Sequence, residues 1–136
     1  MEIWVTILIL FILFDILIVA FILYRKKALN KFSEKDLYYI RAHWVKIIDS
    51  FHAHPKHAIL DADKLLDYAL KKQGFEGSIG EKLKKSGPRF SDLNGLWNAH
   101  KLRNRIAHEL GDIDKNEAKK ALSQFKKALN DLGAKL

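Results

Sequence analysis

Hydrophobic residues follow two different patterns along this chain. Residues 3–24, IWVTILILFILFDILIVAFILY, form an almost continuous apolar run that only Thr6 and Asp15 interrupt. A helix of about 22 residues rises roughly 30 Å, the thickness of the hydrocarbon core of a membrane. The pattern predicts one transmembrane anchor helix over residues 1–24, followed by a basic linker over residues 25–32.

After the linker, hydrophobic residues recur at helical spacing. Ser33 with Asp36 resembles a capping box, and Pro55 suits the first turn of a second helix that Gly74 closes. A short helix is expected over about residues 79–84, within a connection that holds four glycines and a proline.

Two more helices complete this pattern. One is expected over about residues 92–110, with Leu110 on its apolar face and Gly111 ending it, and the last follows Asp114, whose cap signal includes Glu117. No segment alternates with period two, as a half-buried strand would. We therefore predict an all-α fold, in which a single N-terminal transmembrane helix precedes a bundle of four to five helices over residues 33–136.

Composition sharpens this division. The chain has 136 residues and a formal net charge of +8, from 24 Lys and Arg against 16 Asp and Glu. All the basic residues follow Tyr24 and only two acidic ones, Glu2 and Asp15, precede it, so the part after Tyr24 carries a formal charge of +10. The length argues against a multidomain enzyme, and the lack of cysteine excludes disulfides, thiolate metal sites and cysteine nucleophiles.

The charges beside the apolar run predict its orientation. Arg25, Lys26, Lys27 and Lys31 follow it and nothing basic precedes it, so the N-terminus is expected outside the cell membrane and the C-terminal domain in the cytoplasm. The acidic start and long apolar run favour an uncleaved anchor over a signal peptide. Asp15 lies near mid-membrane, where it either self-associates with another helix or is tolerated as a protonated or water-shielded carboxyl.

Two motifs favour a structural explanation over a chemical one. His52, His54 and His57 have an HxHxxH spacing, but a turn does not guarantee the convergence that a metal needs, and we expect solvated histidines. The glycine series at residues 74–80 lacks the P-loop pattern, and we expect these glycines in turns. We expect neither a metal nor another cofactor.

The segment WNAHKLRNRIAHE carries the strongest candidate chemistry. It places Arg103, Asn104 and His108 near the end of one helix. Arginine offers a planar fork for phosphate and histidine moves protons, which together suffice for RNA cleavage without a metal. Substrate-binding candidates from the same helix are His100, Lys101 and Arg105.

Helical geometry separates the two main groups. Five residues turn a helix by about 500°, which leaves Arg103 and His108 about 140° apart. Either the helix distorts near its end or a second copy of the chain completes the cleft. The alternative is that the arginines are solvated and His108 caps helix carbonyls.

The motif of Arg103, Asn104 and His108 resembles the signature of the HEPN superfamily (higher eukaryotes and prokaryotes nucleotide-binding). HPKHAILDADKLLDYAL, GFEGSIGEKL and LWNAHKLRNRIAHEL are similar to the helical arrangement of small prokaryotic HEPN-like proteins. The resemblance implies a homodimer with paired motifs in one cleft. Many members are metal-independent endoribonucleases that leave 2′,3′-cyclic phosphates, often in toxin–antitoxin, antiviral or RNA-processing systems.

By this resemblance, Arg103 would stabilise phosphate charge, Asn104 would orient the phosphate, and His108 would be the acid–base group. RNA is then the expected partner, and an antitoxin or another protein is a further one. The basic surplus fits RNA or anionic lipid equally, and its candidate members are Lys82, Lys84, Lys85, Arg89, Lys101, Arg105, Lys119, Lys120, Lys126 and Lys127. The competing function is a non-catalytic, membrane-tethered adaptor or dimerisation module that binds protein or lipid.

Overall fold

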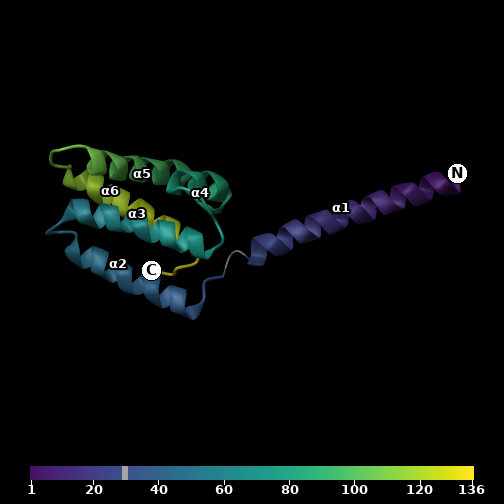
Figure 1. Ribbon diagram of the computed structural model, residues 1–136, viewed down its shortest axis with the longest axis horizontal. Coiled ribbons are helices and arrows are strands. Elements are labelled where there is room, and N and C mark those ends of the chain that lie inside the picture. Colours follow the sequence, from purple (N-terminus) through teal and green to yellow (C-terminus); the bar gives the residue numbers. More distant parts are fainter. Residues whose placement is uncertain (29–30) are drawn as a thin grey trace. The chain divides into compact units, whose positions relative to one another are not determined.

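The computed structural model describes residues 1–28 and 31–136, without the side chains of residues 25–28. The chain divides into two compact units, Met1–Lys31 and Phe32–Leu136. The first unit is a single helix, and the second is a helical bundle (Figure 1).

The first unit consists of helix α1 (Glu2–Ala28). Its stretch Glu2–Tyr24 is long and apolar enough to span a membrane. The predicted basic linker over residues 25–32 begins as helix, since α1 continues to Ala28. Residues 29–30 and the side chains of Arg25, Lys26 and Lys27 lie outside the described residues.

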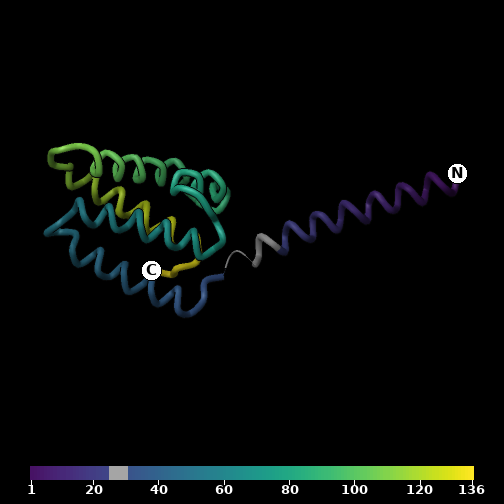
Figure 2. Tube along the Cα trace, in the orientation of Figure 1, coloured from purple at the N-terminus to yellow at the C-terminus, as the bar shows by residue number. Residues whose placement is uncertain are grey.

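The second unit contains the other helices of the described chain. They are α2 (Glu34–Ser50), α3 (Pro55–Lys72), α4 (Ile79–Ser86), the short 3₁₀ helix η1 (Gly87–Arg89), α5 (Leu93–His108) and α6 (Lys115–Asp131). Helix α3 packs against α2, α5 and α6, and α5 also packs against α6 (Figure 2). No strand occurs in residues 1–28 or 31–136, so the all-α prediction is confirmed.

The helices begin where the sequence predicted. The Ser33 hydroxyl accepts a hydrogen bond from the Asp36 backbone N–H, and Asp114 caps α6 in the same way through Glu117. Each such cap satisfies a backbone donor that the first helical turn leaves without a partner. Pro55 is the first residue of α3, as expected.

The core lies where α3, α5 and α6 meet. Leu66 and Leu70 of α3, Leu96 of α5, and Phe125 and Leu129 of α6 are at most 1% exposed. These residues recur at helical spacing, so burying one face of each helix removes a continuous apolar surface from water.

The end of α5 corrects one prediction. The helix stops at His108, because Glu109 takes an extended conformation with φ −110° and ψ 142°. Leu110, which we expected on the apolar face, is fully exposed. The Lys56 ammonium on α3 donates to the Gly111 carbonyl and so ties the following loop to another helix.

Asp36 links α2 to α3. It accepts a hydrogen bond from the Ser33 hydroxyl at 2.7 Å and one from the Tyr68 hydroxyl at 3.0 Å, and it lies 3.7 Å from Lys72. The Ser33 hydrogen bond, assisted by those of Tyr68 and by Lys72, lowers the pKa of Asp36. Burial and the bond to Asp36 raise the pKa of Tyr68.

Candidate functional site

A buried carboxylate of α3 faces the helix that carries the RNxxxH motif. Asp63 Oδ1 lies 2.8 Å from His100 Nδ1, and the two residues are 2% and 6% exposed. An ionised carboxylate only accepts hydrogen bonds, so Nδ1 of His100 carries the hydrogen. In the neutral ring, Nε2 is then an acceptor.

Asn104 uses that acceptor and connects it to Arg103. Its Nδ2 lies 3.3 Å from His100 Nε2 and donates to it, and its Oδ1 accepts from Arg103 Nη1 at 3.0 Å. Arg103 Nε lies 3.2 Å from Asp63 Oδ2 and forms an ion pair with it, but the geometry is not that of a hydrogen bond. Asp63, His100, Asn104 and Arg103 therefore form a closed circuit of contacts, which we call the polar ring.

The polar ring holds the Arg103 guanidinium from one side. Nε and Nη1 face Asp63 and Asn104, whereas Nη2 makes no hydrogen bond to any described residue and is not buried. The side chain as a whole is 28% exposed. A guanidinium fixed on one edge and open on the other can donate to an incoming phosphate without first being ordered.

The opposite side of α5 borders a basic groove. This groove, about 450 Å³ in volume, lies between α5 and α6 and is lined by Lys101 and Arg105 of α5 and by Lys120 of α6. Arg105 forms an ion pair with Glu117 across it. We call it the α5–α6 groove.

His108 stands at the C-terminal end of α5, outside both the polar ring and the lining of the α5–α6 groove. It is the last residue of the helix and is exposed. At about 100° per residue, His108 projects about 20° from Lys101, about 40° from Asn104 and about 140° from Arg103. Because α5 is regular up to His108, it shows no distortion that would turn these two side chains toward each other.

The structure brings five of the six candidate residues into two sets. His100, Asn104 and Arg103 meet in the polar ring, and Lys101 and Arg105 line the α5–α6 groove, whereas His108 belongs to neither set. His100 differs from our expectation of a substrate contact, because it is buried with both ring nitrogens occupied.

Asp63 is the ring member that sequence reasoning did not assign to this site. A signal for it exists in the spacing of Ile59, Asp63, Leu66 and Leu70, which puts one carboxylate into a buried apolar stripe. Such a group requires a partner, because a buried ion without one is costly. The sequence does not say that the partner lies 37 residues away.

The histidine and glycine motifs lie on the surface and in turns. His52, His54 and His57 are exposed, with the rings of His54 and His57 edge to face at 5.7 Å. Within residues 1–28 and 31–136, no three potential ligands converge on a metal position. Gly74 and Gly77 have φ of 90° and 105°, which suits turns.

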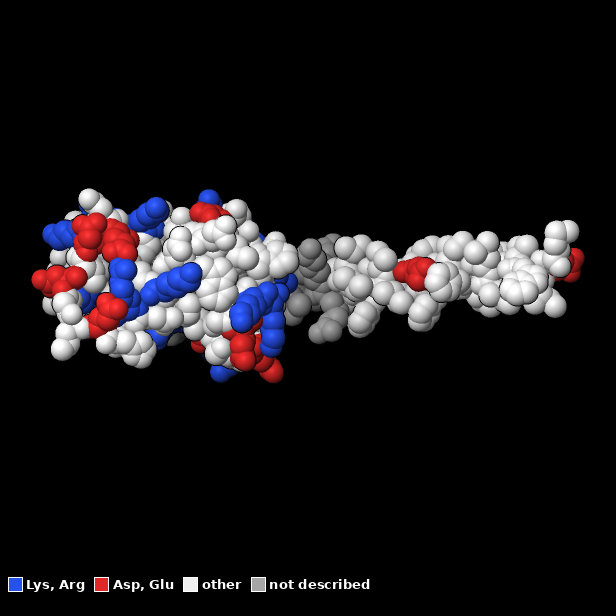
Figure 3. Space-filling model, turned by 90° about the horizontal axis from the view of Figure 1, so that it is seen from above, with Lys and Arg blue, Asp and Glu red and all other residues white. Residues whose placement is uncertain are grey.

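The basic surplus is dispersed over the bundle. Lys82, expected in a phosphate-binding field, is 5% exposed and forms an ion pair with Asp67 at 2.7 Å, which removes it from that field. On the face shown in Figure 3, basic and acidic side chains of the bundle are intermixed, and α1 shows no basic group among the described side chains.

No protein-family model matches this chain, and no significant similarity to a curated protein or a solved structure is found.

Proposed function

We propose that this chain is a membrane-anchored, HEPN-like RNA-binding protein and metal-independent endoribonuclease, with a site assembled from two copies. The observation that carries the proposal is the pair of faces on α5. One face presents Arg103, held in the polar ring with Nη2 free of hydrogen bonds to the described residues, and the other, about 140° away, presents the exposed His108 at the end of the helix whose Lys101 and Arg105 line the α5–α6 groove.

The two faces supply complementary parts of one reaction. Lys101 and Arg105 bind the RNA backbone in the groove, and His108 takes the proton of a ribose 2′-hydroxyl. The 2′-oxygen then bonds to phosphorus, the bond to the 5′-oxygen breaks, and water protonates the departing oxygen. Arg103 stabilises the charge that grows on the phosphate oxygens, and the products are a 2′,3′-cyclic phosphate and a 5′-hydroxyl.

A second copy solves the angular problem on α5. Since α5 is undistorted, Arg103 and His108 of one chain do not face the same phosphate. A two-fold arrangement of two α5 helices brings Arg103 of one copy to His108 of the other. Asp15 favours such pairing, because it has no hydrogen-bond partner among the described residues and lies within the apolar span.

The anchor defines where this activity operates. The basic residues after Tyr24 favour an N-terminus outside and a bundle at the cytoplasmic face of the cell membrane. RNA is made and used in the cytoplasm, so this orientation and the proposed substrate agree.

The proposal is tested with the full chain in detergent, incubated with single-stranded RNA in excess EDTA. Wild type is expected to cut and to leave 2′,3′-cyclic ends, and His108→Ala lowers the rate by about 10² or more. Arg103→Ala lowers it by about 10²–10³. His57→Ala, another exposed histidine, is the matched control. Cleavage that survives both His108→Ala and Arg103→Ala refutes the catalytic assignment.

Mixing the two inactive variants tests the shared site. If each site uses Arg103 from one copy and His108 from the other, a mixed dimer retains one intact site of two. An equal mixture then recovers about a quarter of wild-type activity, because half of the dimers are mixed in a random two-fold assembly. No recovery on mixing would place both groups in one copy.

A non-catalytic adaptor is the second candidate, and an exposed apolar face of α2 favours it. Tyr38, Val45 and Ile48 are 77%, 58% and 44% exposed, and Ile48 borders a shallow hollow between α2 and α6. Exposed apolar patches of this kind mark contact surfaces. An adaptor predicts no RNA cleavage and salt-sensitive binding to anionic vesicles.

A further inference from the structure

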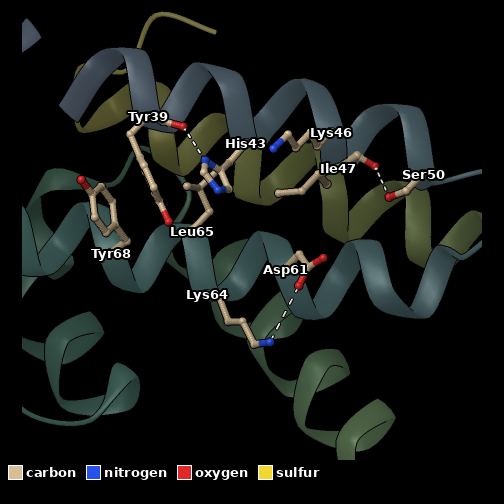
Figure 4. A pocket seen from close by; sticks show the side chains of 9 residues that line it. All are labelled: Tyr39, His43, Lys46, Ile47, Ser50, Asp61, Lys64, Leu65 and Tyr68. Atoms are coloured by element: carbon tan, nitrogen blue, oxygen red, sulfur yellow. Dashed lines mark hydrogen bonds and ion pairs between the residues drawn. The ribbon is translucent and has the colours of Figure 1, made fainter. Parts of the chain in front are cut away.

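A second concave site lies between α2 and α3, and it shares no lining residue with the α5–α6 groove. Its volume is about 390 Å³, within the range of small-molecule sites. Ile47 and Leu65, each 4% exposed, form its apolar floor. We call it the α2–α3 pocket, and Figure 4 shows the side chains that line it.

One wall of the pocket is a stack of three rings. Tyr39 stacks on Tyr68 with ring centroids 4.3 Å apart and on His43 at 3.9 Å. Figure 4 shows Tyr68, Tyr39 and His43 in this order, so His43 is the end of the stack that faces the rest of the pocket. The stack therefore offers its last ring to a further planar group.

The His43 ring is fixed in place. Its Nδ1 lies 2.9 Å from the Tyr39 carbonyl oxygen, which only accepts, so Nδ1 is the donor. This bond and the contact with Tyr39 hold the ring plane before any ligand arrives, which reduces the entropy lost on stacking. In the neutral ring, Nε2 remains an acceptor, with no hydrogen bond to the described residues.

Beyond His43, the pocket is lined by two cations and one carboxylate. Lys46 makes no hydrogen bond or ion pair among the described residues, and Lys64 makes only a 3.8 Å pair with Asp61. The side chains of Lys64 and Asp61 are 72% and 56% exposed, and an exposed pair of this kind contributes little stability. Lys64 can therefore turn to a ligand anion.

From this arrangement we propose that the α2–α3 pocket binds a nucleotide. The base stacks on His43 above the floor of Ile47 and Leu65, the phosphate lies between Lys46 and Lys64, and Asp61 accepts a hydrogen bond from a ribose hydroxyl. The nucleotide is either a free mononucleotide or the 5′-phosphorylated end of a strand. This site does not depend on the proposed cleavage, because its residues are separate from the polar ring and the α5–α6 groove.

The test is isothermal titration of the full chain in neutral detergent. The probes are AMP, adenosine, ribose 5-phosphate and a 5′-phosphorylated tetra-adenylate, which keeps its 2′-hydroxyls and is titrated into the His108→Ala variant so that it is not cut. AMP is expected to bind. Ribose 5-phosphate binds at least about five-fold more weakly, since stacking of a base contributes about 1–3 kcal/mol, and adenosine is weaker as well. Binding of AMP alone identifies a free nucleotide, and comparable binding of the tetranucleotide identifies a strand end.

Variants assign the binding to this pocket. His43→Ala is expected to weaken AMP by at least about five-fold, whereas His43→Phe retains a ring and most of the affinity. The double variant Lys46→Ala and Lys64→Ala weakens AMP several-fold, and Lys71→Ala, an exposed lysine of α3 outside the pocket, does not. The double variant also decides the matter if His43→Ala does not fold. Lack of AMP and tetranucleotide binding, or equal binding by wild type and these variants, overturns the proposal.

Discussion

Replacing Asp63 by Asn should destabilise the bundle, because Asp63 is the only acidic member of the polar ring. Asn keeps an oxygen that can accept from His100 Nδ1, but it turns an amide N–H₂ toward Arg103 Nε, where an ion pair at 3.2 Å stood before. The substitution thus changes one charge and one contact while preserving the size of a side chain that is 2% exposed.

The magnitude follows from two opposing terms. At 3.2 Å, opposite unit charges attract by about 5 kcal/mol at an effective dielectric constant of about 20. Desolvating Asp63 offsets several kcal/mol of this. The His100 hydrogen bond also weakens, because a bond to a charged acceptor contributes about 1.5–3 kcal/mol net and one to a neutral acceptor about 0.5–1.5 kcal/mol, so we expect a total loss of about 1–3 kcal/mol. For a bundle of this size, 1 kcal/mol corresponds to about 4 °C, so Tm should fall by roughly 4–12 °C.

The assay is thermal unfolding of the full chain in detergent, followed by circular dichroism. Asp61→Asn is the matched control, since it makes the same change two residues away on an exposed side chain. Its effect should stay within about 0.5 kcal/mol. If Asp63→Asn lowers Tm no more than Asp61→Asn does, the polar ring does not stabilise the α3–α5 contact, and the argument that it holds Arg103 fails.

Two further predictions concern acid stability and self-association. Because the folded-state pKa of Asp36 is lowered, its contribution is complete above the unfolded value near 3.8 and is lost as pH falls through the folded value. The difference in urea midpoint between wild type and Asp36→Asn should therefore be present at pH 7 and shrink below about pH 4; a constant difference would contradict this assignment. Asp15→Leu should weaken self-association of the full chain in micelles by about three- to seventeen-fold, measured by energy transfer on dilution, because interhelical hydrogen bonds contribute about 0.6–1.7 kcal/mol. Asp15→Asn should retain most of the association, and an effect of Phe14→Leu equal to that of Asp15→Leu would argue against a polar contact.

Local signals predicted the helix starts well. Ser33, Pro55 and Asp114 act within three residues of their own helix, so a single sequence contains the information. The end of α5 was harder to predict from the sequence. Leu110 continues the apolar spacing of Ile106, but Glu109 is extended and Lys56 holds Gly111 from another helix, which no local pattern shows.

The candidate site was predictable in its residue types but not in its grouping. The motif indicated Arg103, Asn104 and His108, and helical spacing alone separated the first from the last. Asn104 bridges Arg103 to the buried His100, and His100 is in turn held by Asp63 of α3. Such pairing across helices is a tertiary property, and periodicity cannot supply it.

The polar ring also fixes how α3 and α5 lie along each other. Sliding α5 by one turn, about 5.4 Å, would place Leu96 or Asn104 where His100 now meets Asp63. With Leu96 in that position, the buried Asp63 carboxylate would have no hydrogen-bond donor, which costs several kcal/mol. Shifting purely apolar contacts by one turn carries no such penalty. A bundle whose core is largely leucine and alanine would otherwise tolerate several alignments. One acidic side chain thus restricts α3 and α5 to a single alignment, and it thereby determines where Arg103 and Asn104 lie on the bundle.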